Sequence, residues 1–340
     1  MKRVFVLLLV LVGTAIAQSN DLGVMLGTIG GSPQRRVEIA KQLSASWYRP
    51  EPVLLGSEHA SCEDCEAARA GGLKLVLVVR NATALNKASL PLSDPVAYQQ
   101  KLRAALDRYK PEIVVVENEP EDKDAFAGSP DEYATELKAA CEVTHAANIK
   151  CTDGGLASPD LAGVVIDELW KTDKLQAADF GIATEIVRAK NPGTTISVLG
   201  RTMGGQVSIQ QTVEKATAGY LEKHRADIDR SRAFLLAGAS AGPDYANFHW
   251  YELKPEEVTT VLDVLGRLNK RAQMTDEIGQ MEERPFETGD KIKILLDAGV
   301  RPIIWAGIDG KDKVGLVDKK GDLRPTGRAF QQAAQKGVSQ

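Results

Sequence analysis

The chain has few aromatic residues and few histidines. Only 5% of its 340 residues are aromatic, and it contains four histidines. His59, His145 and His224 show no metal-ligand spacing with one another. A His-Glu-x-x-His motif, a phosphate-binding loop and a dinucleotide fingerprint are all missing from the sequence. The sequence therefore gives no sign of a metal or an organic cofactor, and we expect neither.

Blocks of Lys and Arg are also missing. The formal net charge is −4, and charges of both signs are interspersed along the chain. This pattern argues against nucleic acid or an anionic membrane as a partner. A hydrophobic content of 43% is enough for a large core. There is no internal repeat and no Pro-rich linker, and we expect a monomer.

The one long apolar run lies at the N-terminus. Lys2 and Arg3 precede an apolar segment from Val4 to Val12, and Ala15-Ile16-Ala17 fits a small-x-small cleavage site. A membrane anchor, the alternative, needs about 20 apolar residues. We therefore predict a signal peptide over residues 1–17, cleaved so that no membrane anchor remains. The mature protein would be secreted or periplasmic.

The chain contains only four cysteines, Cys62, Cys65, Cys141 and Cys151. In an exported protein an even number suggests disulfides. Three pairings are possible, and proximity in the sequence favours Cys62–Cys65 and Cys141–Cys151. A four-cysteine zinc site normally uses two closely spaced pairs, and only the first two cysteines have that spacing. The same Cys-x-x-Cys has no thioredoxin-like context around it, so we interpret the cysteines as structural crosslinks.

Apolar, β-prone runs alternate with segments of helical periodicity through residues 18–340, which is typical of repeated βα units around a parallel sheet. The candidate strands are Leu22–Gly27, Ser44–Arg49, Lys74–Arg80, Glu112–Asn118, Ile149–Asp153, Ala246–Tyr251, Gln273–Asp276 and Arg301–Ala306. Eight strands are what a (β/α)8 TIM barrel requires. We therefore predict an α/β chain that forms one such barrel.

The helices between these strands are predicted from apolar spacing and start signals. The predicted helices include Val96–Tyr109, a helix opened by Ser129 and Pro130, Pro255–Leu268 and Gly289–Ala298. Residues 154–245 are far more than one βα connection needs. Helical patterns at Ser158–Trp170, Ala177–Ala189 and Val207–Ser231 fill this stretch, with Gly204-Gly205 as a break. We predict an enlarged fifth βα unit there.

Carboxylates follow two of the predicted strands directly. Glu117-Asn118-Glu119-Pro120 follows three valines, and Asp276-Glu277-Ile278-Gly279 ends a later strand. Barrel enzymes build their active sites where strands end. Cleavage of a glycosidic bond needs two carboxyl groups close together, and two glutamates at one barrel mouth would provide them. Asp276 competes with Glu277, because a shift of one residue would swap which carboxylate faces the mouth. Glu117 and Glu121 flank Glu119 and are expected to be supporting or exposed.

The ordered series of motifs resembles the clan A glycoside hydrolases, which are retaining (β/α)8-barrel glycosidases that include families 5 and 39. The resemblance implies an acid/base glutamate in Asn118-Glu119-Pro120 at the end of strand four and a nucleophile in Glu277-Ile278-Gly279 at the end of strand seven. His249-Trp250-Tyr251 is similar to the His-x-Tyr of strand six. Arg49 matches an arginine of strand two, and Trp305 a tryptophan of strand eight.

These residues have complementary roles in such an enzyme. Glu119 would donate a proton to the leaving oxygen, so it should be protonated and have a raised pKa. Glu277 would be ionised and attack the anomeric carbon, with the two carboxyl groups about 5–5.5 Å apart. Arg49 would keep Glu277 charged, and Tyr251 would donate a hydrogen bond to it. Asn118 would bind the sugar 2-hydroxyl.

Two of these residues have structural alternatives. His249 is either a hydrogen-bonded residue of the barrel wall or a member of the site, and its same-face spacing with Tyr251 favours the site. Arg49 either serves the site or neutralises Glu51.

Aromatic side chains pack on the apolar faces of sugar rings, so their positions bear on the substrate. Trp47, Tyr48, Trp250, Tyr251 and Trp305 lie on three of the predicted strands. Trp250 has opposite parity to its neighbours in the site and is expected in the core. Trp305 is the predicted sugar platform.

The sequence thus predicts a retaining β-glycosidase that acts on a poly- or oligosaccharide. The rival interpretation is a barrel that binds carbohydrate without cleaving it, or an inactive glycosidase-like scaffold, because one fold hosts many functions. Sugar and linkage depend on loop shape, which the sequence does not specify.

Overall fold

A computed structural model of the chain describes residues 20–27, 31–57, 61–183, 206–251, 255–280, 284–307 and 315–337. The predicted signal peptide over residues 1–17 lies outside these described residues. So does the predicted break at Gly204-Gly205.

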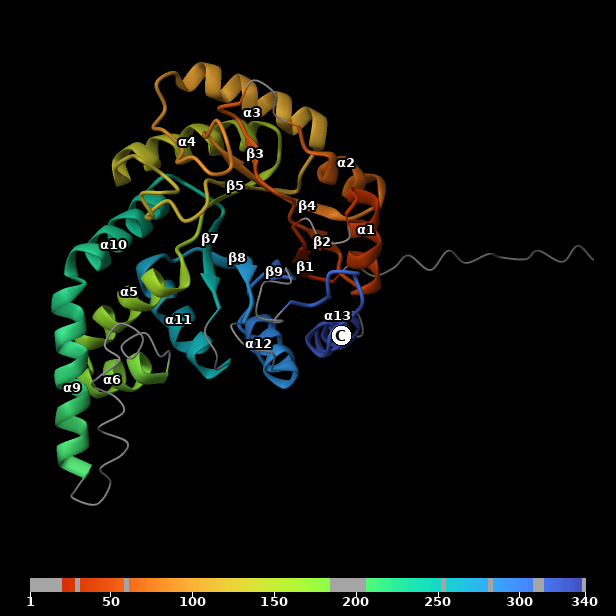
Figure 1. Ribbon diagram of the computed structural model, residues 1–340. Helices are drawn as coiled ribbons and strands as arrows, with labels where there is room; N and C mark the ends of the chain where they lie inside the picture. The colour runs from red at the N-terminus through yellow and green to blue at the C-terminus, as the bar shows by residue number, and fades with distance from the viewer. Residues whose placement is uncertain are drawn as a thin grey trace, which may run out of the picture.

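Eight parallel strands form a closed barrel that is surrounded by helices (Figure 1). In chain order the barrel strands are β1 (Leu22–Met25), β2 (Trp47–Tyr48), β4 (Lys74–Arg80), β5 (Ile113–Val116), β6 (Lys150–Asp153), β7 (Tyr245–Trp250), β8 (Ala272–Ile278) and β9 (Ile303–Ala306). β1 pairs with β9, and β2 pairs with β4, which closes the ring. The short strand β3 (Val53–Leu54) pairs with the end of β4. All eight predicted strands are confirmed, with ends that differ by a few residues.

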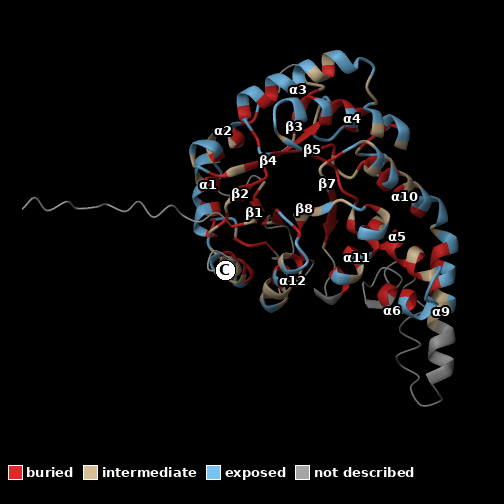
Figure 2. Ribbon diagram, turned by 180° about the vertical axis from the view of Figure 1, so that it is seen from behind, coloured by how far each residue is buried: buried red, intermediate tan, exposed pale blue. Residues whose placement is uncertain are grey.

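Side chains alternate between two apolar layers along the strands. On β4, Val76 and Val78 point into the barrel, whereas Leu75, Leu77 and Val79 pack under the helices. This is the period of two expected of a strand that is buried on both faces. The near-continuous apolar runs of the sequence follow from it, and Figure 2 shows the strands as buried along most of their length.

Helices form the outer ring. They are α1 (Pro33–Gln42), α2 (Glu63–Ala70), α3 (Pro95–Tyr109), α4 (Pro130–Ala146), α11 (Pro255–Leu268), α12 (Pro285–Asp297) and α13 (Pro325–Gly337). Side chains of Ser32, Asp94 and Ser129 cap the first turns of α1, α3 and α4, each followed by a proline. Such a cap satisfies a backbone N–H that has no partner within the helix, and proline fits the first turn because it lacks this N–H.

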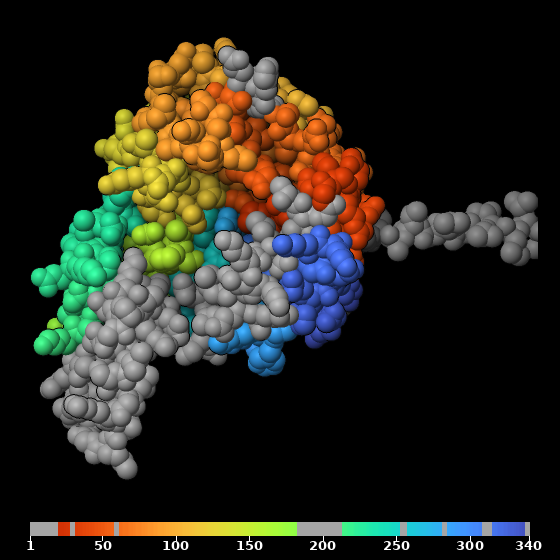
Figure 3. Space-filling view, in the orientation of Figure 1, coloured from red at the N-terminus to blue at the C-terminus, as the bar shows by residue number. Residues whose placement is uncertain are grey.

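The fifth βα unit is enlarged, as predicted. Between β6 and β7 the described residues form α5 (Ser158–Trp170), α6 (Lys174–Ala183), α9 (Gln206–Lys223) and α10 (Arg225–Ser240). The helix predicted over Val207–Ser231 is two helices that meet at His224. In the space-filling view α10 (green) lies along one side of the molecule next to α4 (yellow), which it contacts (Figure 3). The helices of the enlarged unit therefore extend the outer ring of helices on one side of the barrel.

Both favoured cysteine pairings are present. Cys62 and Cys65 are bonded at the start of α2, and Cys141 and Cys151 join α4 to β6. Among the described residues, helices long and apolar enough to cross a membrane are not found.

Candidate active site

The loop after β5 carries Glu119 in a constrained backbone. Glu117 and Glu119 both have positive φ angles, 65° and 49°, in the left-handed region that non-glycine residues seldom adopt. Such conformations persist only where the surroundings hold them. The buried carboxylate of Glu117 accepts hydrogen bonds from the Asn81 N–H at 2.7 Å and the Ser89 hydroxyl at 2.5 Å. Glu117 therefore ties the loop that carries Glu119 to the loop after β4.

A β-bulge in β8 sends two consecutive carboxylates toward the barrel mouth. Asn247 pairs with Met274 and His249 with Glu277, so β8 has one residue more than β7 over this stretch. An extra residue of this kind interrupts the alternation of side chains. Asp276 is fully buried, and the side chain of Glu277 is 18% exposed. The two carboxylates are therefore not alternatives, because both belong to the site.

Arg49, at the end of β2, connects these groups. Its Nε donates to Oδ2 of Asp276 at 2.8 Å, and its Nη2 lies 3.3 Å from Oε2 of Glu277. Nη2 also donates to Oδ1 of Asn118 at 2.6 Å, and Nη1 contacts the sulfur of Met25. Arg49 thus serves the site rather than neutralising Glu51. Asn118, expected to bind the sugar, also has the role of orienting Arg49.

His249 lies in the site between two acids. Its Nδ1 is 2.9 Å from Oε1 of Glu119, and its Nε2 is 3.0 Å from Oδ1 of Asp276. The ring is fully buried. Asn247 supports the same arrangement, because its Nδ2 donates to Oδ1 of Asp276 at 2.6 Å.

Asn247 is a member of the site that was not predicted from the sequence. A signal was present, because Asn247, His249 and Tyr251 alternate with the apolar Phe248 and Trp250 along β7. Polar residues at a period of two share one face of a strand.

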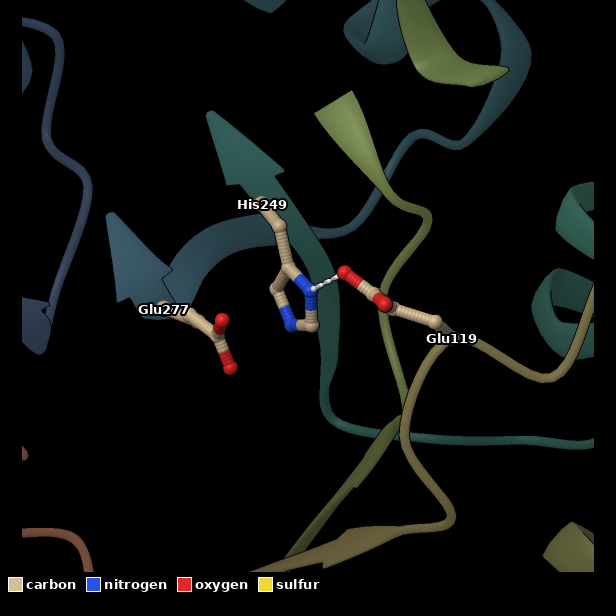
Figure 4. A group of neighbouring side chains, drawn as sticks. All are labelled: Glu119, His249 and Glu277. Carbon is tan, nitrogen blue, oxygen red and sulfur yellow. Dashed lines mark hydrogen bonds and ion pairs between the residues drawn. The ribbon is translucent and has the colours of Figure 1, made fainter. Parts of the chain in front are cut away.

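Glu119, His249 and Glu277 converge at the mouth from β5, β7 and β8 (Figure 4). Each offers one nitrogen or oxygen atom, and these atoms all lie within 4.8 Å of one another. The side chain of Glu119 is 28% exposed, so both glutamates can be reached by a ligand. A carboxylate–imidazole set can bind a divalent cation. Here, however, both nitrogens of His249 already face carboxylates, so a cation would have to displace one of these contacts.

The charge state of Glu119 differs from the expected one. Burial would raise its pKa, but the hydrogen bond and the charge of His249, together with the charge of Arg49, lower it below the ordinary value. The prediction of a raised pKa is therefore wrong. A neighbouring cation favours the ionised form of a carboxyl group, and the sequence did not show that His249 would be this neighbour.

His249 and Asp276 form the opposite end of the same network. Burial would lower the pKa of His249, but its hydrogen bonds to Asp276 and Glu119 and the charges of Asp276 and Glu277 raise it well above the ordinary value. Burial would raise the pKa of Asp276, but the charge of Arg49 and the contact with His249 lower it. These pKa shifts favour the imidazolium form of His249 and the carboxylate form of Asp276.

Tyr251 is placed where the sequence predicts it. Its hydroxyl donates to Oε1 of Glu277 at 2.8 Å. The ring lies against Gly279, because a Cβ on Gly279 would be 2.6 Å from Cε1 of Tyr251. A contact that short is not tolerated, so glycine is required two residues after Glu277 for the tyrosine to reach it.

Trp305 does not belong to the site, and its prediction as a sugar platform is wrong. Its side chain is fully buried under the helices, with its ring edge-on to Phe330 of α13 at 6.4 Å between centroids. Ile304 and Ala306, on either side, point into the barrel instead. Trp250 lies in the core against Phe180, as expected.

The two strand-two aromatics are structural as well. Trp47 is buried inside the barrel beside Lys74, and Tyr48 is buried under the helices. Of the five aromatics noted in the sequence, Tyr251 alone contacts the glutamates among the described residues.

Glu121 is buried behind Glu119. Its Oε1 accepts a hydrogen bond from the N–H of Ala157 at 2.6 Å, at the start of α5. Burial raises its pKa to about 8. Glu117 and Glu121 are therefore supporting groups, and neither is exposed.

Solved structures of other proteins share the fold of this chain. No family model and no curated protein matches the chain. It is similar to a family 39 glycoside hydrolase from Bacteroides cellulosilyticus, with a TM-score of 0.58 and 12% identity over 94% of this chain. The chain spans 64% of that enzyme's length.

The chain is also similar to two family 128 enzymes. One is an endo-β-1,3-glucanase of subgroup II from Pseudomonas viridiflava, with a TM-score of 0.52, 17% identity and coverage of 92% of this chain and 97% of that one. Another, of subgroup I from Amycolatopsis mediterranei in complex with laminarihexaose, has a TM-score of 0.50 and 10% identity, with coverage of 92% and 99%. The resemblance to barrel glycoside hydrolases predicted from the sequence is confirmed in the fold that these proteins share.

Proposed function

We propose that this protein is a retaining β-glycosidase that hydrolyses a poly- or oligosaccharide by double displacement. Glu119 is the acid/base and Glu277 the nucleophile. The observation that carries the proposal is that one carboxylate oxygen of Glu119 lies within 4.8 Å of one of Glu277, at the same barrel mouth. Retaining glycosidases hold their two carboxyl groups about 5–5.5 Å apart, whereas inverting ones need about 6.5–9.5 Å to fit a water.

The reaction runs in two steps. In the first, an oxygen of Glu277 bonds to the anomeric carbon. The glycosidic bond breaks at the same time, and Glu119 passes a proton to the leaving oxygen. In the second, water attacks the anomeric carbon, its proton passes to Glu119, and the carboxylate of Glu277 is released. Both glutamates end as they began.

Arg49 and Tyr251 prepare Glu277 for attack. The guanidinium 3.3 Å from Oε2 stabilises the negative charge, and the hydroxyl 2.8 Å from Oε1 directs the carboxylate. As the bond to the sugar forms, this charge is lost, and it is restored when the intermediate is hydrolysed. Groups held in place by buried partners stabilise such changes without first having to reorganise. Arg49 is held in this way by Asp276 and Asn118.

The first substrates to test are β-1,3-linked glucans. Two structures of similar fold are named as endo-β-1,3-glucanases, one in complex with laminarihexaose. We propose laminari-oligosaccharides as the first class, with cello-, xylo- and manno-oligosaccharides as comparisons.

The test is product analysis on this panel. We expect the wild-type chain to release product whose anomeric configuration, followed by proton NMR during the first turnovers, matches that of the substrate. Inverted product would exclude Glu277 as a nucleophile. E277Q should lose about 10³-fold or more in kcat, because the covalent intermediate cannot form. E63Q, at an exposed glutamate in α2, is the matched control and should keep full activity.

A second candidate function is carbohydrate binding without cleavage. Two observations favour it, the lowered pKa of Glu119 and the burial of Trp305 away from the mouth. Glycan binding detected by calorimetry, with no product from any member of the panel after prolonged incubation, would support this function in place of hydrolysis.

We also propose that the protein is exported and acts as a monomer on its glycan. The support for export is the pair of disulfides, since such bonds persist in oxidising compartments. Fractionation of producing cells and size-exclusion chromatography with light scattering test the two statements separately.

A further inference from the structure

His249 bridges the proposed acid/base to a second, fully buried acid. Its Nδ1 faces Oε1 of Glu119 at 2.9 Å, and its Nε2 faces Oδ1 of Asp276 at 3.0 Å. An imidazole can donate from both nitrogens only when it is protonated. Two carboxylate acceptors, one on each side, therefore hold the proton on the ring.

The bridge is sealed from solvent. His249 and Asp276 are fully buried. Gly155 closes the site above the ring, since a Cβ there would lie 2.8 Å from Nε2 of His249. Asn247 donates to the same oxygen of Asp276 that faces His249, at 2.6 Å. The ring has little room to turn away from either acid.

Charged and titratable groups reach this network from the ends of five barrel strands. Glu119 follows β5, Asp276 and Glu277 lie on β8, and Arg49 ends β2. Asp153, which ends β6, accepts from the backbone N–H groups of Gly155 and Asn247, and Tyr251 follows β7. Arg49 is the one fixed cation among these described groups, and it is paired with Asp276. A second positive charge, on His249, balances Glu119.

This arrangement raises a question for the proposed reaction. A general acid must supply a proton when the glycosidic bond breaks. The hydrogen bond from His249, however, favours the ionised form of Glu119. The nearest proton available to Glu119 is the one on Nδ1 of His249.

We propose that Glu119 and His249 act as one acid–base couple, in which His249 stores the proton that Glu119 delivers, and Asp276 is a positioning residue that keeps His249 charged and aimed. This inference rests on the proposed glycosidase function. It assigns a role to Asp276, the carboxylate of β8 that the two-glutamate mechanism does not need.

The couple gives up one proton and takes one back in each turnover. When the glycosidic bond breaks, the proton on Nδ1 passes to the carboxylate of Glu119, and the carboxyl group turns and hands it to the leaving oxygen. His249 is then neutral and Glu119 ionised, while Glu277 is bonded to the sugar. When water attacks, its proton passes through Glu119 to Nδ1, and the imidazolium is restored as Glu277 leaves. No other reactant is needed.

The first experiment measures the charge of His249 in the full, ligand-free chain. Nitrogen-15 chemical shifts of the imidazole, assigned by comparison with H249Q, report protonation directly, and no turnover is needed. We expect both ring nitrogens to be protonated at pH 7.5 in the wild-type chain. A neutral ring at that pH overturns the couple. Because this measurement is made on the wild-type protein, its result remains valid even if a variant fails to fold.

The second experiment follows kcat/KM against pH for wild-type and D276N chains on the best substrate of the panel. If the couple holds the proton, activity falls at high pH when His249 loses it. D276N should move this basic limb to lower pH by about one pH unit or more. The reason is that loss of the neighbouring negative charge lowers the pKa of His249 by about that amount. A basic limb that stays in place or moves to higher pH overturns the couple. A merely structural loss in D276N lowers the rate at all pH values alike, and that result also overturns it.

The outcomes separate the two proposals. A chain that cleaves glycans and has a neutral His249 at pH 7.5 overturns the couple and leaves the glycosidase function intact. A chain that cleaves no glycan overturns the glycosidase function, and the couple with it, whatever the charge of His249. D179N, in α6 outside the network, is the control and should leave the pH profile unchanged.

Discussion

The hydroxyl of Tyr251, directly after β7, donates a hydrogen bond to Oε1 of Glu277 on the neighbouring strand β8. The tyrosine ring also lies against Gly279, with no room for a Cβ between them. The Glu-x-Gly and His-x-Tyr motifs, which are far from each other in the sequence, are therefore parts of one contact. This contact can be tested from both sides.

Removing the hydroxyl should weaken catalysis without unfolding the protein. A hydrogen bond to a charged group contributes about 1.5–3 kcal/mol. We expect Y251F to lower kcat/KM by about 10- to 100-fold at unchanged melting temperature. Y245F, at the start of the same strand, is the matched control and should behave like the wild-type chain. Unchanged activity of Y251F would show that Glu277 does not depend on this contact.

Adding a methyl group at Gly279 should displace the same ring. A Cβ there would lie 2.6 Å from Cε1 and 2.8 Å from Cδ1 of Tyr251. We expect G279A to lose at least as much activity as Y251F, and the double variant to lose little more than either one, because both changes remove one contact. Additive losses in kcat/KM would refute the shared contact.

The control for this substitution is Gly289, which lies in α12 with open space where a Cβ would stand. We expect G289A to keep full activity and to gain about 0.5–1 kcal/mol in the free energy of unfolding, because alanine favours the helix.

Trp305 should matter for stability rather than for substrate binding. It is fully buried and packs edge-on against Phe330. We expect W305A to lower the free energy of unfolding by about 3–5 kcal/mol, measured by urea denaturation. F286A, at a side chain that is 82% exposed, should change it by less than about 0.5 kcal/mol. A higher KM for W305F at unchanged stability would return Trp305 to the sugar site.

Glu121 should make the fold less stable as the pH rises. Burial raises its pKa to about 8, above the value near 4.3 expected in the unfolded chain. A raised pKa in the folded state means that the stabilisation is complete below about pH 4 and is lost as the pH rises through about 8. Urea denaturation should therefore give a smaller free energy of unfolding for the wild-type chain at pH 8.5 than at pH 5.

E121Q removes this titration while keeping the acceptor for the N–H of Ala157. We expect the decline in stability between about pH 5 and 8.5 to be smaller in E121Q by an amount on the order of a few kcal/mol. E142Q, at an exposed glutamate in α4, should decline as the wild-type chain does. Parallel curves for E121Q and the wild-type chain would contradict the assignment.

Predictions that rest on local chemistry agree with the structure. An unbroken apolar run marks β4 as a strand, and Ser129 with Pro130 starts α4. The pairing of Cys141 with Cys151 follows from a separation of ten residues. In each case the interacting groups are neighbours in the chain, so a short window of sequence contains the whole interaction.

Predictions fail where distant partners decide. Ile303, Ile304, Trp305 and Ala306 are all apolar, so nothing local shows which of them face the barrel interior and which face the helices. The bulge in β8 is visible only in its register with β7 and β9, and it brings both Asp276 and Glu277 to the mouth.

The sequence by itself determined the barrel, the crosslinks and the placement of two glutamates at strand ends, because apolar runs and motif order are written along the chain. Only the tertiary structure decided the charges of these groups. Glu119 meets His249 across 130 residues, and His249 meets Asp276 across 27. A carboxyl group releases or keeps its proton according to the charges and dipoles within a few ångströms of it, and folding alone brings these together.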